Sequence, residues 1–114
     1  MVNRFMRLLI LFDLPTTTKN DVKAYRRFVK YLKSEGYVRV QYSVYSKLCI
    51  NSDAATTASK RLEMNAPVNG DIRYLVITER QYQNIININN EHSLQEQIIT
   101  MDRTLMIGGM NNEA

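Results

Sequence analysis

Asp13 is the residue best placed for chemistry, because its carboxylate ends an apolar run. Residues 7–15 are Arg-Leu-Leu-Ile-Leu-Phe-Asp-Leu-Pro, a pattern typical of a strand buried on both faces and closed by proline. A carboxylate needs water, a cation or hydrogen-bond donors around it. At the tip of a central strand, Asp13 can meet solvent or a metal ion. The alternative is that Asp13 only caps the turn that follows.

A second candidate for chemistry is a set of positive charges in residues 19–33. At about 100° per residue, six cations of the expected helix fall within an arc of roughly 120°. They are Lys19, Lys23, Arg26, Arg27, Lys30 and Lys33. No acidic residue interrupts this arc, so lateral ion pairs do not explain it. A solvated helix surface and a phosphate-binding face remain open as interpretations.

Composition limits the classes of protein to which the chain can belong. Its 114 residues, with 45% hydrophobic and 23% charged residues, fit a single globular domain. No apolar stretch is long enough for a membrane span, and we expect a cytoplasmic protein with no membrane partner. Cys49 is the single cysteine, which excludes an internal disulfide. Residues 1–50 hold ten basic and three acidic side chains, against five and eight in the remainder, which favours a polyanion partner of the first half.

The elements that position these residues follow from periodicity and capping. Thr18 and Asp21 form an expected capping box, and Gly36 ends the helix that they begin. The pattern predicts a strand ending at Asp13, a helix over 19–35, two strands or one bent strand over 37–50, a helix over 54–64 and a strand over 71–78.

This order, β-α-β-β-α-β, predicts an α+β domain of the ferredoxin-like class. Its antiparallel sheet carries helices on one face and leaves the other face open. Dimerisation through the open face is the expected way to cover it.

Residues 79–114 are expected to form a C-terminal extension of this single domain, which spans 1–114. A short helix is predicted within 79–87, and His92 falls in a polar loop where exposure is expected. The last segment with strand character is Thr104, Leu105, Met106 and Ile107, followed by two glycines. Because the sheet is already complete, this strand is predicted to pair along an edge of its own sheet or of a neighbour's.

Three segments together resemble one family. They are the strand that ends in Phe-Asp-Leu-Pro, the basic helix that contains Lys-Ala-Tyr-Arg-Arg-Phe, and Gln-Tyr-Ser-Val-Tyr shortly after Arg39. Their order and spacing resemble CRISPR-associated protein 2 from about Met6 to Ile107. Tyr-Arg-Arg-Phe and Ser-Val-Tyr-Ser-Lys are most similar to the type II-A branch of that family.

The resemblance implies a ferredoxin-like homodimer in which the two copies of Asp13 face each other across the two-fold axis. That position can bind a divalent ion, usually Mg²⁺, and metal-dependent cleavage of RNA or DNA has been attributed to it. A hard cation between two carboxylates would relieve their repulsion. The resemblance also implies roles beside this site for Ser43 and Tyr45, and a role in nuclease activity for Arg39.

The same resemblance implies a scaffold in spacer acquisition. The dimer is expected to bridge dimers of the integrase, CRISPR-associated protein 1, and to lie along prespacer duplex DNA. Candidate phosphate contacts are Lys23, Arg26, Arg27 and Lys30, and residues 104–107 match the tail that pairs across the dimer and docks the integrase.

Two hypotheses therefore stand: a non-catalytic DNA-holding dimer and a Mg²⁺-dependent endonuclease that uses Asp13. The sequence favours the first, because each chain offers one carboxylate at the candidate site and no adjacent histidine or lysine base. A third and weaker hypothesis is a stand-alone toxin ribonuclease of the same fold. This hypothesis would leave the basic helix and the tail unexplained.

Overall fold

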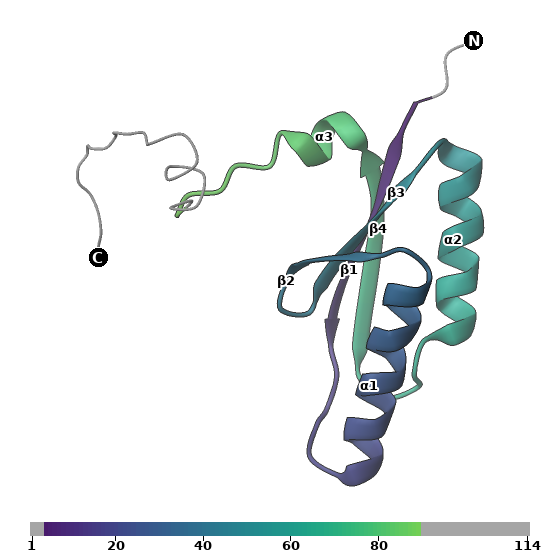
Figure 1. Cartoon of the computed structure of the whole chain (residues 1–114), viewed down its shortest axis with the longest axis vertical. Coiled ribbons are helices and arrows are strands. Elements are labelled where there is room, and N and C mark those ends of the chain that lie inside the picture. The colour runs from purple at the N-terminus through teal and green to yellow at the C-terminus, as the bar shows by residue number, and fades with distance from the viewer. Residues whose placement is uncertain (1–3, 90–114) are drawn as a thin grey trace. The chain divides into compact units, whose positions relative to one another are not determined.

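The computed structural model describes residues 4–89 of the chain, and Figure 1 shows the arrangement of their helices and strands. The elements are β1 Met6–Asp13, α1 Lys19–Ser34, β2 Val38–Gln41, β3 Val44–Cys49, α2 Ser52–Asn65, β4 Asp71–Thr78 and α3 Glu79–Gln83. The four strands form an antiparallel sheet in the order β2-β3-β1-β4, with β1 inside it. The predicted α+β architecture with ferredoxin-like order is thereby confirmed.

The structure divides at Asn84, and the fold described below is that of the first compact unit. The predicted strand Thr104–Ile107 and His92 lie outside the described residues. Within residues 4–89, no helix is long and apolar enough to cross a membrane.

Helix α1 begins and ends where local capping predicts. The Thr18 hydroxyl accepts a hydrogen bond from the Asp21 amide at 3.0 Å, and the Asp21 carboxylate accepts one from the Thr18 amide at 3.2 Å. These two bonds satisfy amides that have no partner inside the helix. At the other end, Gly36 adopts φ 90°, as the predicted helix terminus requires.

Strand β1 differs from the prediction that both of its faces are buried. Leu8, Ile10 and Phe12 are buried, whereas Leu9 is half-buried and Leu11 is 40% exposed. The difference arises because α1 and α2 both cover the same face of the sheet (Figure 1). An unbroken apolar run therefore has one face against the helices and the other on the open side.

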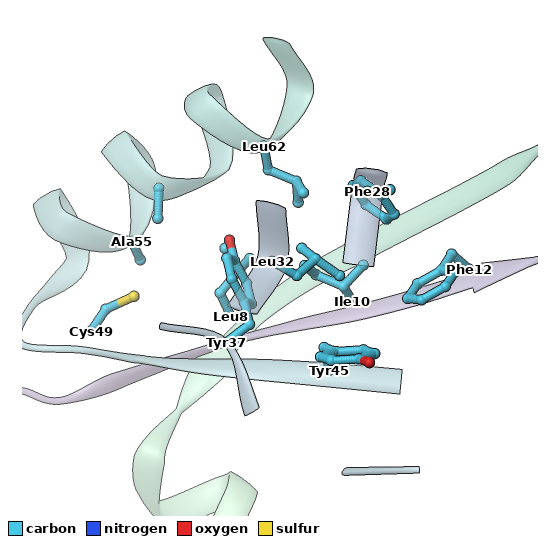
Figure 2. Packing of buried hydrophobic residues seen from close by; sticks show 11 residues of the cluster. Leu8, Ile10, Phe12, Phe28, Leu32, Tyr37, Tyr45, Cys49, Ala55 and Leu62 are labelled. Carbon is cyan, nitrogen blue, oxygen red and sulfur yellow. The ribbon is translucent and has the colours of Figure 1, made fainter. Parts of the chain in front are cut away.

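The core lies between the sheet and the two helices. Leu8 and Ile10 from β1 pack with Phe28 and Leu32 of α1 and with Leu62 of α2 (Figure 2).

Phe12 extends this core to the end of β1. Its ring contacts Tyr25, Phe28 and Tyr45, with ring centroids 6.1, 5.3 and 5.8 Å away. Aromatic packing around Phe12 thus fixes the end of the strand just before Asp13.

The segment 37–50 forms two strands, as predicted, with a tight turn at Tyr42 and Ser43. Ser43 has φ 68°, a left-handed conformation that non-glycine residues seldom adopt. The turn is held to the central strand, because the Phe12 amide donates to the Ser43 carbonyl at 3.1 Å. The β2–β3 turn therefore lies beside the end of β1.

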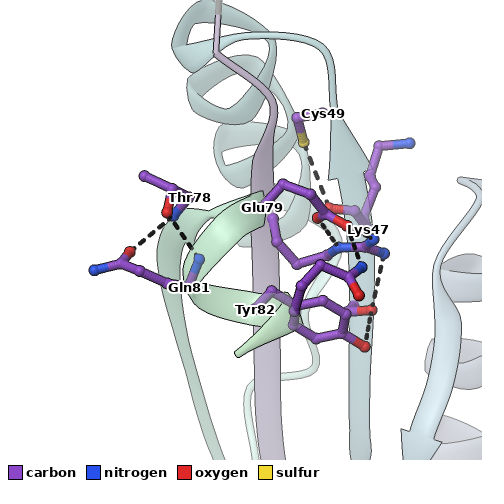
Figure 3. Close-up of polar contacts among 9 residues, drawn as sticks. Lys47, Cys49, Thr78, Glu79, Gln81 and Tyr82 are labelled. Atoms are coloured by element: carbon purple, nitrogen blue, oxygen red, sulfur yellow. Dashed lines mark hydrogen bonds and ion pairs between the residues drawn. The ribbon is translucent and has the colours of Figure 1, made fainter. Parts of the chain in front are cut away.

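The predicted short helix after β4 is present as α3, and it is bound to the open side of the sheet. Arg7 donates to both carboxylate oxygens of Glu79, at 2.7 and 2.6 Å, and its guanidinium lies 4.2 Å from the Tyr82 ring centroid. The Ser46 hydroxyl donates to the Tyr82 hydroxyl at 3.2 Å, and Figure 3 shows this group of contacts. Helix α3 thereby covers one end of the open face.

Gly70 brings the start of β4 close to the end of β1. It has φ 102°, and a Cβ at this position would lie 2.5 Å from Leu14 Cδ2 and 3.0 Å from the Asp13 carbonyl oxygen. Only glycine combines this backbone angle with so close an approach.

We expect Gly70→Ala to destabilise the fold by more than about 1 kcal/mol, because the methyl group meets backbone as well as an unfavourable φ. Gly36→Ala is the matched control, since it has a similar φ but would meet only the flexible end of Lys47 at 3.4 Å. Urea unfolding of both variants measures the difference. Equal losses at the two glycines would contradict the close approach at Gly70.

The Arg7–Glu79 pair predicts a pH-dependent contribution to stability. The hydrogen bond from Arg7 to the Glu79 carboxylate lowers the pKa of Glu79 below the ordinary value of 4.5. A lowered folded-state pKa gives stability that is present above the unfolded-state pKa and is lost as pH falls through the folded-state pKa. Glu79→Gln should therefore lower the free energy of unfolding by about 1 kcal/mol at neutral pH. The loss is no larger because solvent screens this partly exposed ion pair. Thermal unfolding should show this gap closing in acid, and a gap independent of pH would refute it.

Candidate functional site

The end of β1 brings two carboxylates from distant parts of the sequence to the same end of the sheet. In the β1–β4 register, Asp13 is the partner of Asp71, so the two residues lie on the same face. They line a shallow hollow of about 200 Å³ together with Leu11, Phe12 and Arg73. Asp13 is exposed, as a strand-end carboxylate requires.

The two carboxylates differ in their partners. Arg73 donates to both oxygens of Asp71, each at 3.0 Å, and this hydrogen bonding holds the pKa of Asp71 below its ordinary range. Across residues 4–89, no ion pair or side-chain hydrogen bond engages Asp13. Asp13 is therefore the carboxylate of this pair that remains available to a ligand.

One chain does not supply a complete metal site at this position. Nowhere in the described part of the chain do three histidine, cysteine, aspartate or glutamate side chains form a group that could hold a metal ion. Asp71 is already bound by Arg73. A metal ion here would need ligands from outside the chain, such as water or the Asp13 of a second copy.

Ser43, Tyr45 and Arg39 lie in different surroundings. Ser43 is in the β2–β3 turn, next to the end of β1 that carries Asp13. Tyr45 is 5% exposed and stacks on Phe12 within the core, on the helix side of the sheet. Arg39 is paired with Tyr45 in the sheet register, so it belongs to the same side. The structure brings Ser43 close to the Asp13 end and places Tyr45 and Arg39 on the other face.

The cationic face of α1 is exposed along the whole helix. Its members are Lys19, Lys23, Arg26, Arg27, Lys30 and Lys33, and all are exposed. No ion pair found within residues 4–89 includes any of them. Their charges are therefore available to a partner, and we call this set the α1 basic face.

Two hollows adjoin the α1 basic face and share Arg26. A hollow of about 530 Å³ at the start of the helix is lined by Thr17, Thr18, Lys19, Val22, Lys23 and Arg26. The second, about 330 Å³, is lined by Tyr25, Arg26, Val29, Lys30 and Lys33. Arg27 instead lines a separate hollow beside Leu14, Pro15 and Pro67. Lys23, Arg26 and Lys30 thus form a continuous surface, and Arg27 lies at its margin.

The sequence analysis did not predict that the Asp71 carboxylate lies beside Asp13. The sequence could have predicted this position of Asp71. A strand that begins at residue 71 and pairs antiparallel with β1 must start where β1 ends.

Comparison with known proteins identifies the fold and the family. The family model described as CRISPR associated protein Cas2 matches residues 6–85. A relative named "CRISPR-associated endoribonuclease Cas2" from Streptococcus mutans serotype c (strain ATCC 700610 / UA159) is 46% identical over 86 residues, which cover 75% of this chain and 79% of the relative. One of the same name from Lacticaseibacillus rhamnosus (strain ATCC 53103 / LMG 18243 / GG) is 39% identical over 103 residues, covering 90% of this chain and 100% of the relative.

A solved structure described as Streptococcus pyogenes Cas2 at pH 6.5 is similar in fold. Its TM-score is 0.54 with 20% sequence identity, and the match covers 72% of this chain and 98% of that chain. The sources of these relatives, Streptococcus and Lacticaseibacillus, are consistent with the type II-A-like motifs of the sequence. A family match over residues 6–85, with relatives this similar, establishes that the chain belongs to the CRISPR-associated protein Cas2 family.

Proposed function

We propose that this chain acts in CRISPR adaptation as a DNA-holding subunit. Its homodimer would bridge two dimers of the integrase, CRISPR-associated protein 1, and bind the backbone of prespacer duplex DNA. The observation that carries this proposal is the α1 basic face, which is exposed and is not neutralised by ion pairs within residues 4–89. Membership of the Cas2 family supports the CRISPR context.

The α1 basic face has the charge and the length to lie along a phosphate backbone. The 16 residues of α1 extend about 24 Å, the length of roughly seven base pairs. Lysine and arginine side chains on one helical arc contact phosphates and fix position without sequence selectivity. A subunit that holds DNA fragments of varied sequence needs this kind of contact.

The open face of the sheet supports the proposed homodimer. Leu11, Leu48 and Leu75 are exposed there, around half-buried Leu9. A contiguous exposed apolar surface of this kind marks an interaction site. A second copy is the occupant that we propose, with residues 104–107 as the segment that docks the integrase.

A Mg²⁺-dependent endonuclease is the second candidate, and it is supported by the relatives' name, which describes an endoribonuclease. The specific observation is exposed Asp13 on the open face, at the end of the central strand. Two copies that meet through this face would hold Mg²⁺ between their Asp13 carboxylates, and the bound ion would stabilise charge on a phosphodiester. We favour the DNA-holding role, because one chain offers so few ligands within its described residues.

Reversing charge on the α1 basic face should weaken DNA binding. Lys23→Glu with Arg26→Glu is expected to reduce affinity for a blunt duplex by at least roughly tenfold and to lower its salt dependence, because phosphate contacts are lost. Fluorescence anisotropy at several salt concentrations measures both effects. The matched control is Lys60→Glu with Arg80→Glu, which changes net charge equally at exposed positions of α2 and α3. Equal losses of DNA affinity in the two double variants would show that net charge, and not the α1 basic face, determines binding.

Asp13→Asn separates the two candidate functions, since it removes the charge but keeps the shape. If the chain only holds DNA, the variant should support spacer integration with the integrase at the wild-type level. Its control, Asp53→Asn, changes an exposed carboxylate on α2. Loss of integration in Asp13→Asn alone would overturn our preference. Mg²⁺-dependent cleavage that is present in wild-type protein and absent in Asp13→Asn would establish the second candidate.

A further inference from the structure

Asp71 and Arg73 share the open face of the sheet with Asp13. Their neighbours in β4 lie on the helix side, because Ile72 packs against the core and the Tyr74 hydroxyl donates to a glutamate of α2 at 2.6 Å. Side chains alternate along a strand, so residues 71 and 73 lie on the opposite side. The register agrees, since Asp71 is the partner of Asp13.

This end of the open face combines two carboxylates with one cation. Asp13, Asp71 and Arg73 line the same hollow of about 200 Å³. Residues directly opposite each other in an antiparallel pair have Cβ atoms about 4.5–5.5 Å apart, so the two carboxylates are close neighbours that repel each other. Among the residues that line the hollow, Arg73 is the cation that can offset this repulsion.

The cation at the other end of β1 is already neutralised. Arg7 donates to both carboxylate oxygens of Glu79, and this ion pair adds no net charge to the open face. The described strands therefore give the open face one net negative charge per copy, from Asp13 and Asp71 against Arg73. Without Arg73, the open face would carry two.

This charge matters when the open face meets a second copy. A two-fold dimer brings the same surface of both copies together, so each net charge faces its equal. Coulomb repulsion grows with the product of the two charges, and loss of Arg73 would raise it about fourfold. A divalent cation would offset such repulsion, yet Arg73 already holds both oxygens of Asp71 at 3.0 Å.

We propose that Arg73 is the resident counter-ion of the open face. It supplies at the Asp13–Asp71 pair the positive charge that a divalent cation would otherwise supply, so that two copies associate without a metal ion. The inference rests on the homodimer of the proposed function and adds to it the charge condition for association. The Arg73 side chain is largely exposed, so its replacement tests charge more than packing.

The experiment measures the dimer dissociation constant by sedimentation at low ionic strength, where charges are least screened. In EDTA, Arg73→Gln is expected to associate at least roughly fivefold more weakly than wild-type protein, because each open face then carries two negative charges. Mg²⁺ should bring Arg73→Gln to within about twofold of wild type, and NaCl of equal ionic strength should restore less. Wild-type association should change by less than about twofold between EDTA and Mg²⁺.

Two further variants separate the charge of Arg73 from its hydrogen bonds. Arg73→Lys keeps the charge and loses the two-pronged contact with Asp71, and it should associate as wild type does. Arg73→Gln combined with Asp71→Asn removes the ion pair and returns the face to one negative charge, so its association in EDTA should also match wild type. A double variant as weak as Arg73→Gln would assign the pair a structural role and overturn the inference. So would undiminished association of Arg73→Gln in EDTA, or a wild-type dimer that dissociates in EDTA.

Mn²⁺ binding, followed by electron paramagnetic resonance, tests the counter-ion independently of the dimer. Arg73→Gln should bind Mn²⁺ at least roughly threefold more tightly than wild type, because the cation beside the carboxylates is gone, and adding Asp13→Asn should abolish this gain. A monomeric wild-type protein would refute the proposed homodimer. In that case, tighter Mn²⁺ binding by Arg73→Gln would leave the counter-ion standing, and equal affinity would overturn it.

Discussion

The packing of both long helices on one face of the sheet is the constraint on which the remaining features depend. It buries Leu8, Ile10 and Phe12 and turns the alternate residues of β1 toward the open face. Asp13 shares that face because side chains alternate along a strand. The same packing directs the apolar stripe of α1 inward and leaves its cations exposed. An apolar open face and a basic helix face thus follow from one arrangement.

The two faces allow the proposed contacts to coexist. DNA on the α1 basic face and a second copy on the open face would use opposite sides of the sheet. Asp13 belongs to the open face, away from the α1 basic face. A nuclease centre at Asp13 would therefore be spatially separate from the surface that we propose for DNA, which is why substitutions can distinguish the two proposed functions.

Acidic side chains of the described region are largely engaged in structural contacts. Glu79 binds Arg7, Asp71 binds Arg73, and Glu35 binds Arg61. Asp21 caps α1. The cations of α1 are consequently not neutralised by these carboxylates and remain available to an external partner. The pair of Arg7 with Glu79 instead holds α3 against the sheet. The paired charges and the exposed, unpaired cations of the described residues thus lie on different elements.

The sequence by itself determined the elements and their order. The capping box at Thr18, the helix after it, the bend within residues 37–50 and the strand over 71–78 were all confirmed, because capping and periodicity act between residues close in the chain. Only the tertiary structure decided which face of β1 is covered, that Asp71 lies opposite Asp13, and that Tyr45 is in the core while Tyr42 is exposed. These features depend on the register of strands that are far apart in the sequence and on the side of the sheet on which the helices pack. No local sequence pattern predicts the register or the side.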